Sequence, residues 1–104
     1  MDFNLNSATL DGTGLIVSVD GELDNATVPA LESALLHALD SGAASIVLDL
    51  RRVSFIDSIG LRVLVWAARE SRGDGDRLRI DCGSGAVRRV IELSTLDRLL
   101  PLTG

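Results

Sequence analysis

Apolar and polar residues alternate at the start of the chain in the way that favours β-strands. Phe3 to Leu10 alternates well enough for one strand, and Leu15 to Val19 for a second. Asp11-Gly12-Thr13-Gly14 lies between them, and an Asp-Gly pair flanked by apolar alternation is a good hairpin signal. The N-terminal part of the chain is therefore predicted to form a β-hairpin.

The spacing of apolar residues becomes helical from Val28 to about Leu39. The residues expected on the buried side of this helix are Val28, Leu31, Leu35 and Leu39. Pro29 falls in the first turn, where a missing N–H does no harm, and Ser41-Gly42 ends the helix. The only histidine, His37, falls on the opposite side, so we expect it to be solvated and to take no part in catalysis or metal binding.

The middle of the chain reads as a strand followed by a second helix. The apolar run Ile46–Leu50 suits a strand that is buried on both faces, and Arg51–Ile56 is predicted as a connection. Helical spacing returns at Ile59 and continues to about Ser71, where the polar segment Arg72–Asp76 ends it. This arrangement places Asp57 and Ser58 at the start of the second helix.

A further strand and helix follow. Leu78–Cys82 alternates as a fourth strand, with Cys82 expected to be a small buried residue rather than a reactive thiol. Ser84 is the expected cap of a third helix, whose inner face would carry Val87, Val90, Ile91 and Ser94. Gly83–Gly85 could cradle a phosphate, but three such residues are more often an ordinary loop.

The order of these elements predicts an α/β fold in a single domain, residues 1–104. We expect a mixed four- to five-stranded β-sheet, built from a hairpin and strand-helix-strand crossovers, with helices packed mainly on one face. A chain of 104 residues is long enough to bury a core but too short for a second domain.

Charge and composition narrow the possible partners. The net charge of −5 argues against nucleic acid or an anionic membrane and permits a basic protein surface. The sequence shows no signal peptide and no apolar run long enough to span a membrane. The single cysteine allows no internal disulfide, so a reducing, cytoplasmic environment is expected.

Asp57 and Ser58 are the candidate functional residues. The simplest interpretation is that they only cap the second helix, because their side-chain oxygens can accept hydrogen bonds from its first N–H groups. A phosphate on Ser58 would also be favoured at a helix N-terminus. Gly60 costs helix stability in the first turn, which suggests a surface that something approaches closely.

The segment around these residues resembles the signature of bacterial anti-sigma factor antagonists, which are STAS-domain proteins. The matching segment is Asp49-Leu50-Arg51-Arg52-Val53-Ser54-Phe55-Ile56-Asp57-Ser58-Ile59-Gly60-Leu61. In that family a partner kinase phosphorylates the serine that corresponds to Ser58. Ile59 stands where the family most often has Ser or Thr, so no neighbouring hydroxyl is available as an alternative acceptor.

A second segment, Gly21-Glu22-Leu23-Asp24, also matches the family, which implies that it lies beside the phosphorylation loop and that Asp24 helps to form the kinase-facing surface. The alternative is a turn in which Asp24 merely solvates the chain. Trp66 either covers the helix edge or contacts a partner. The expected partner-binding residues are Glu22, Asp24, Asp57, Ile59, Gly60, Leu61, Arg62 and Trp66.

The resemblance implies partner switching as the function. The unphosphorylated protein would bind an anti-sigma factor that is an ATP-dependent serine kinase and thereby release a sigma factor. A PP2C-type phosphatase would reverse the phosphorylation. We expect no cofactor, no metal and no enzymatic activity, since no base, metal-ligand set or Walker-type loop accompanies Ser58. The protein should be a monomer or a weak dimer.

Two other possibilities remain open. One is a STAS module in a stressosome-like scaffold or a lipid-transport accessory role, and the other, with less support, is a small enzyme. The family also usually has Gly at the position of Thr95. Because a β-branched residue is costly in a left-handed helix cap, we expect the third helix to end differently here.

Overall fold

The computed structural model describes residues 3–10, 12–72 and 77–103. Asp11 of the predicted hairpin turn lies outside these ranges. Of the predicted polar segment Arg72–Asp76, only Arg72 lies within them. The strands are β1 (Asn4–Leu10), β2 (Gly14–Leu23), β3 (Ser45–Ile56), β4 (Leu78–Asp81) and β5 (Leu102–Thr103). The helices are α1 (Val28–Asp40), α2 (Ser58–Arg72), α3 (Ala86–Leu93) and the short 3₁₀ helix η1 (Leu96–Arg98).

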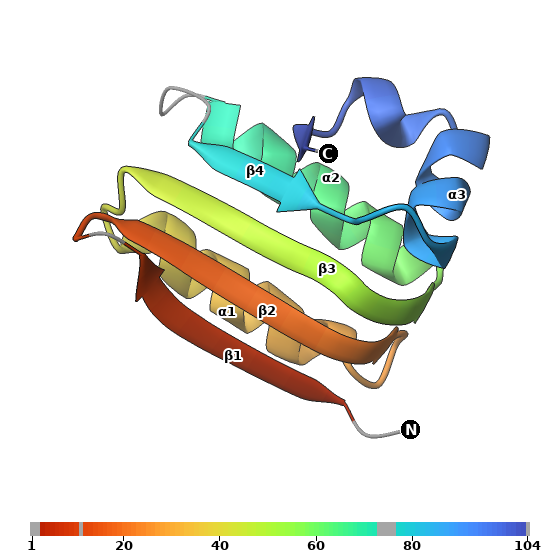
Figure 1. Ribbon diagram of the computed structural model, residues 1–104, viewed down its shortest axis with the longest axis horizontal. Coiled ribbons are helices and arrows are strands. Elements are labelled where there is room, and N and C mark those ends of the chain that lie inside the picture. Colours follow the sequence, from red (N-terminus) through yellow and green to blue (C-terminus); the bar gives the residue numbers. More distant parts are fainter. Residues whose placement is uncertain (1–2, 11, 73–76, 104) are drawn as a thin grey trace.

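The five strands form one mixed sheet in the order β1-β2-β3-β4-β5. β1 pairs antiparallel with β2 as the predicted hairpin, and each of the other neighbouring pairs is parallel. Helices α1 and α2 lie behind this sheet in Figure 1, whereas α3 lies near the end at which β3 stops. The predicted α/β architecture, with helices mainly on one face of a four- to five-stranded sheet, is confirmed.

An aliphatic core lies between the sheet and these two helices. Helix α1 buries Val28, Leu31, Leu35 and Ala38, so Ala38 takes the place that the pattern gave to Leu39. Helix α2 buries Gly60, Val63, Leu64, Ala67, Ala68 and Ser71. The opposing sheet residues include the fully buried Val17, Leu48 and Ile80. Burial of these side chains provides the main drive for folding.

Strand β3 is longer than predicted. Residues 51–56 are not a connection but continue the strand, because β2 also continues and pairs Gly21 with Val53 and Leu23 with Ile56. Irregularities in the β2–β3 register interrupt the alternation of buried and exposed residues, as β-bulges do. That interruption makes the segment look like a loop in the sequence.

The prediction that β3 is buried on both faces is wrong. Ile46, Leu48 and Leu50 are buried, whereas Val47 and Asp49 between them are only partly buried. Alternate residues of a strand point to opposite faces, and only one face of this sheet carries α1 and α2. The apolar Val47 therefore faces the side that these helices do not cover.

The ends of α3 differ from the predictions. Its N-cap is Gly85 rather than Ser84, and no side-chain hydrogen bond caps it. At its other end, Ser94 N–H donates to the carbonyl of Val90, and Thr95 follows with φ 60° and ψ 15°. The helix thus ends in the left-handed conformation that was not expected of a threonine.

No helix among the described residues is long and apolar enough to cross a membrane.

Candidate functional site

Asp57 is the residue that starts α2. Its carboxylate oxygen Oδ1 accepts hydrogen bonds from the N–H groups of Ile59 and Gly60, both at 3.0 Å. Its backbone carbonyl accepts the N–H of Leu61 at 3.0 Å. Asp57 is therefore the N-cap of α2, in keeping with the preference of Asp for this position and with the helix dipole.

Ser58 is the first residue of α2 and is exposed. Its hydroxyl makes no hydrogen bond with any residue that the structure describes, because Asp57 alone does the capping. The sequence suggested that a phosphate on Ser58 could use the free N–H groups of the first turn. The structure corrects this point, since the N–H groups of Ile59 and Gly60 are already occupied by Asp57.

Gly60 is buried, and packing within the chain explains its place in the first turn. A Cβ atom at this position would lie 2.6 Å from Cγ1 of Ile56 and 3.3 Å from Cβ of Leu23. The close approach inferred from the sequence is therefore made by the last residues of β2 and β3. It gives no support to Gly60 as a residue that touches a partner.

The segment after β2 lies beside the start of α2, as the second motif implied. Asp57 N–H donates to the carbonyl of Leu23 at 3.1 Å, which joins the two chain segments. Oδ1 of Asp24 accepts the N–H groups of Ala26 and Thr27 at 3.0 and 3.1 Å. The hydroxyl of Thr27 donates to the carbonyl of Glu22 at 2.7 Å. Asp24 thus orders the turn that leads into α1, whatever else it contacts.

Two exposed apolar side chains lie within three residues of Ser58 along the chain. Ile59 is 38% exposed, and Phe55, near the end of β3, is 47% exposed. Phe55 pairs with Glu22 of β2, whose side chain is also exposed. Phe55 was not predicted as a site residue because it lay in an apparent loop, although a large aromatic residue there was a usable signal. An apolar contact surface beside a modifiable hydroxyl suits a switchable protein interface.

A groove of about 340 Å³ lies along the outer side of α2 and begins at Ser58. Its lining residues are Ser58, Leu61, Arg62, Val65, Arg69 and Leu96, so we call it the α2–η1 groove. Arg62 and Arg69 are exposed, and neither forms an ion pair with a described residue. Both arginines belong to α2, and the fold brings Leu96 of η1 beside them.

The other predicted partner residues are divided by the fold. Leu61 and Arg62 line the α2–η1 groove with Ser58. Trp66 is partly buried and packs against the hydrophobic core, which supports the interpretation that it covers the helix edge. Glu22 and Asp24 belong to the neighbouring segment. The structure therefore gathers most of the predicted residues at one corner, where β2 and β3 end.

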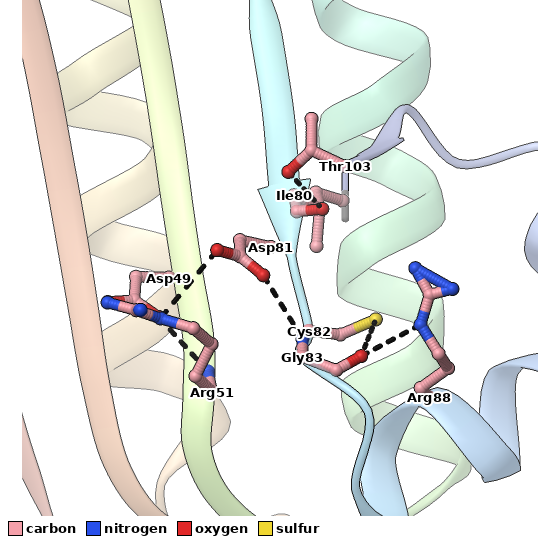
Figure 2. Close-up of polar contacts among 8 residues, drawn as sticks. All are labelled: Asp49, Arg51, Ile80, Asp81, Cys82, Gly83, Arg88 and Thr103. Atoms are coloured by element: carbon pink, nitrogen blue, oxygen red, sulfur yellow. Dashed lines mark hydrogen bonds and ion pairs between the residues drawn. The ribbon is translucent and has the colours of Figure 1, made fainter.

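A separate polar network on the uncovered face joins β3, β4 and α3 (Figure 2). Nε and Nη2 of Arg51 donate to the two carboxylate oxygens of Asp49, both at 3.0 Å, and Nε lies 3.6 Å from Oδ2 of Asp81. The side-chain hydrogen bonds from Arg51 lower the pKa of Asp49. Asp81 accepts the N–H of Gly83, whose carbonyl accepts Nε of Arg88. These bonds serve to hold the elements together.

Cys82, at the end of β4, is buried and free. Burial raises the pKa of its thiol, which keeps it protonated and unreactive at neutral pH. This agrees with its predicted role as a small core residue. Among the described residues, no group of three or more histidine, cysteine or acidic side chains is arranged to hold a metal ion.

Known proteins resemble this chain over nearly its whole length. The family model described as "Mlab, STAS domain" matches residues 7–101. The anti-sigma-F factor antagonist RsfB of Mycobacterium tuberculosis is 32% identical over 84% of this chain and 70% of the relative. The anti-sigma-B factor antagonist of Staphylococcus aureus is 33% identical over 96% of this chain and 92% of the relative.

A solved structure supports the same assignment. The crystal structure of an anti-sigma factor antagonist from Mycobacterium paratuberculosis superposes with a TM-score of 0.85 at 32% identity. The superposition covers 97% of this chain and 85% of the other. The fold, the family model and the two relatives agree, and the chain belongs to the STAS-domain family of anti-sigma factor antagonists.

Proposed function

We propose that this protein binds an anti-sigma factor and thereby releases a sigma factor for transcription. The relatives from Mycobacterium tuberculosis and Staphylococcus aureus, which are 32% and 33% identical to this chain, are named as antagonists of such factors. The observation that carries the proposal is the exposed, uncommitted hydroxyl of Ser58 at the edge of an apolar surface. The contact surface would comprise Ile59, Leu61 and Arg62 of α2, together with Phe55 and the segment that contains Glu22 and Asp24.

The partner in this proposal is an anti-sigma factor with an ATP-dependent serine kinase domain. Oγ of Ser58 attacks the γ-phosphorus of ATP and gives up its proton, and ADP leaves, so that the serine becomes a phosphomonoester. A PP2C-type phosphatase hydrolyses this ester with water and returns serine and inorganic phosphate. Asp57 does not act as the acceptor, because its carboxylate is engaged as the cap of α2.

Phosphorylation would weaken the complex for a simple electrostatic reason. The phosphate brings a charge of about −1.5 to −2 at neutral pH to a surface that includes Ile59 and Leu61. Binding would require that charge to be desolvated next to Asp57, which is already negative. The chain already has a net charge of −5, so its overall electrostatic field does not offset the added negative charge of the phosphate.

The experiment is a binding measurement with the kinase-domain anti-sigma factor of the source organism. Wild type, Ser58→Ala and protein carrying phosphoserine at position 58 are compared. Ser33→Asp serves as a control for negative charge added elsewhere on the surface, because Ser33 is an exposed serine on α1 that lines a pocket with Ser7 and Leu15 rather than with Ser58. We expect wild type, Ser58→Ala and Ser33→Asp to bind and the phosphorylated protein to lose at least tenfold in affinity.

Two results would contradict the proposal. If no anti-sigma factor binds the unphosphorylated protein, the domain serves instead as a scaffold or transport-accessory module, and gel filtration would then test for stable self-assembly. If the phosphorylated protein binds as tightly as wild type, Ser58 is not the switch. A monomer or a weak dimer in gel filtration is expected under the proposed function.

A further inference from the structure

The first turn of α2 offers a phosphate on Ser58 fewer hydrogen bonds than its N-terminal position suggests. The N–H groups of Ile59 and Gly60, which could otherwise bind it, already donate to Asp57 at 3.0 Å. Asp57 is also the neighbouring residue and repels a phosphate. A phosphoryl group here is therefore expected to turn away from the cap and toward positive charge.

The nearest positive charge along α2 is Arg62. Residues four apart on a helix face the same side, and the four-residue step from Ser58 to Arg62 is about 6 Å along the axis. Both residues line the α2–η1 groove. Arg62 forms no ion pair with a described residue, so binding the phosphate would not require it to break an ion pair with one of these residues.

The rest of the groove favours an anion near Ser58. Its lining contains two arginines and no acidic residue, in a chain whose net charge is −5. Arg69 lies eleven residues beyond Ser58, or about 16 Å along the helix, which is too far for direct contact. Of the two arginines in the groove, Arg62 is the one that can form a charge-assisted hydrogen bond with the phosphate, whereas Arg69 contributes a screened field.

We propose that Arg62 binds the phosphoryl group of phosphorylated Ser58 within the same chain, in the α2–η1 groove. This inference rests on the proposed modification of Ser58. It adds a second effect to the switch, since the phosphate not only repels a partner but also removes Arg62 from the contact surface. Arg62 is thus a positioning residue that fixes the phosphate against α2.

The test measures the second ionisation of the phosphate by ³¹P NMR titration. Phosphoserine is incorporated at position 58 of the full chain in the wild-type, Arg62→Gln, Arg69→Gln and Arg72→Gln backgrounds. Arg69 lies in the groove two turns beyond Arg62, and Arg72 is an exposed arginine at the C-terminal end of α2, fourteen residues from Ser58 and outside the groove. The three variants therefore lose the same charge at different distances from the phosphate.

A nearby arginine favours the dianion and so lowers this second pKa. We expect Arg62→Gln to raise it by about half a unit, and Arg69→Gln and Arg72→Gln to change it by less than about 0.2 unit at 0.15 M salt. Thermal unfolding confirms that each variant is folded. Equal shifts in all three variants, or no shift in Arg62→Gln, would overturn the inference.

The failure of this inference can be told apart from the failure of the proposed function. The titration needs no partner, whereas the proposed function depends on binding by the unphosphorylated chain. If Arg62→Gln leaves the phosphate pKa unchanged but abolishes binding of the unphosphorylated protein to the anti-sigma factor, the groove is a partner site. That outcome would refute the intrachain contact and leave the proposed function intact.

Discussion

Thr95 holds a backbone conformation that β-branched residues rarely adopt. Its φ of 60° lies in the left-handed region, and it is the only described non-glycine residue with a positive φ. Its hydroxyl donates to the carbonyl of Ser94, but this contact is exposed and offsets little of the strain. The strain is tolerated because α3 must end here for η1 to follow and for Leu96 to reach α2.

Replacing Thr95 with glycine should therefore stabilise the protein. We expect a gain of about 0.5–1 kcal/mol in the free energy of unfolding, because relief of the left-handed strain exceeds the entropy cost of glycine. Urea unfolding of wild type and Thr95→Gly measures the difference. Thr95→Ala, which keeps a Cβ atom, should gain less, and equal stability of Thr95→Gly and wild type would show that no strain is present.

Gly60 should be intolerant of even a methyl group. Alanine would gain about 1 kcal/mol in helix propensity, but its Cβ would overlap Cγ1 of Ile56, at 2.6 Å. Overpacking of this kind costs about 1–3 kcal/mol, so we expect Gly60→Ala to be destabilised on balance. The control is Gly85→Ala, where a Cβ meets nothing within 4 Å and the loss should stay below about 1 kcal/mol. Thermal unfolding compares them.

The first turn of α2 depends on its cap. Loss of a capping carboxylate costs about 0.5–2 kcal/mol, so Asp57→Ala should lower the midpoint of urea unfolding measurably. Asp57→Asn keeps an oxygen that can accept the N–H groups of Ile59 and Gly60, and its midpoint should stay close to wild type. If Asn and Ala variants are equally destabilised, charge rather than capping dominates at this position.

The sequence predicted the helices and strands whose apolar residues recur at regular spacing, and it missed the part of β3 that forms only by pairing with β2. The stripes of α1 and α2 repeat at helical spacing, which depends on local geometry alone. The extension of β3 through Phe55 depends on pairing with β2, whose irregular register cannot be seen in either segment by itself. Likewise, the apolar run Ile46–Leu50 suggested a strand buried on both faces, whereas the order of the elements correctly predicted helices mainly on one face of the sheet.

Across the whole molecule, stability should depend on pH through Asp49. Arg51 lowers the pKa of this carboxyl in the folded protein, so the ion pair adds stability at pH values above the unfolded pKa. That contribution is lost as the pH falls below about 4 and through the lower, folded pKa. Because Arg51 is largely exposed, solvent screening keeps this contribution at pH 7 small.

Asp49→Asn tests this dependence through the free energy of urea unfolding, measured at pH 7 and at several values below about 4. The variant should be less stable than wild type at pH 7, and the two should converge as the pH is lowered. Arg51→Gln, which removes the cation, should behave in the same way. A difference between Asp49→Asn and wild type that is constant with pH would mean that the carboxylate charge is not responsible.

The sequence predicted which residues make up the candidate site better than it predicted what these residues pack against. Asp57 and Ser58 followed from one motif and Asp24 from a second, and the structure brings the two motifs together through the hydrogen bond from Asp57 N–H to the carbonyl of Leu23. The roles of Gly60 and Trp66 depended on what packs against them, which the sequence does not contain. Leu96 lies more than thirty residues from Ser58 in the chain, so only the tertiary structure reveals the groove that they share.

The burial of Cys82 gives the protein a built-in reporter of its own opening motions. A thiol that is enclosed and protonated in the native state reacts with a disulfide reagent such as DTNB only when the end of β4 becomes accessible. The rate of colour development would therefore follow transient opening without any added label. A cysteine introduced at an exposed position could also be modified selectively, which would allow a fluorophore to be placed beside Ser58 in the otherwise native chain.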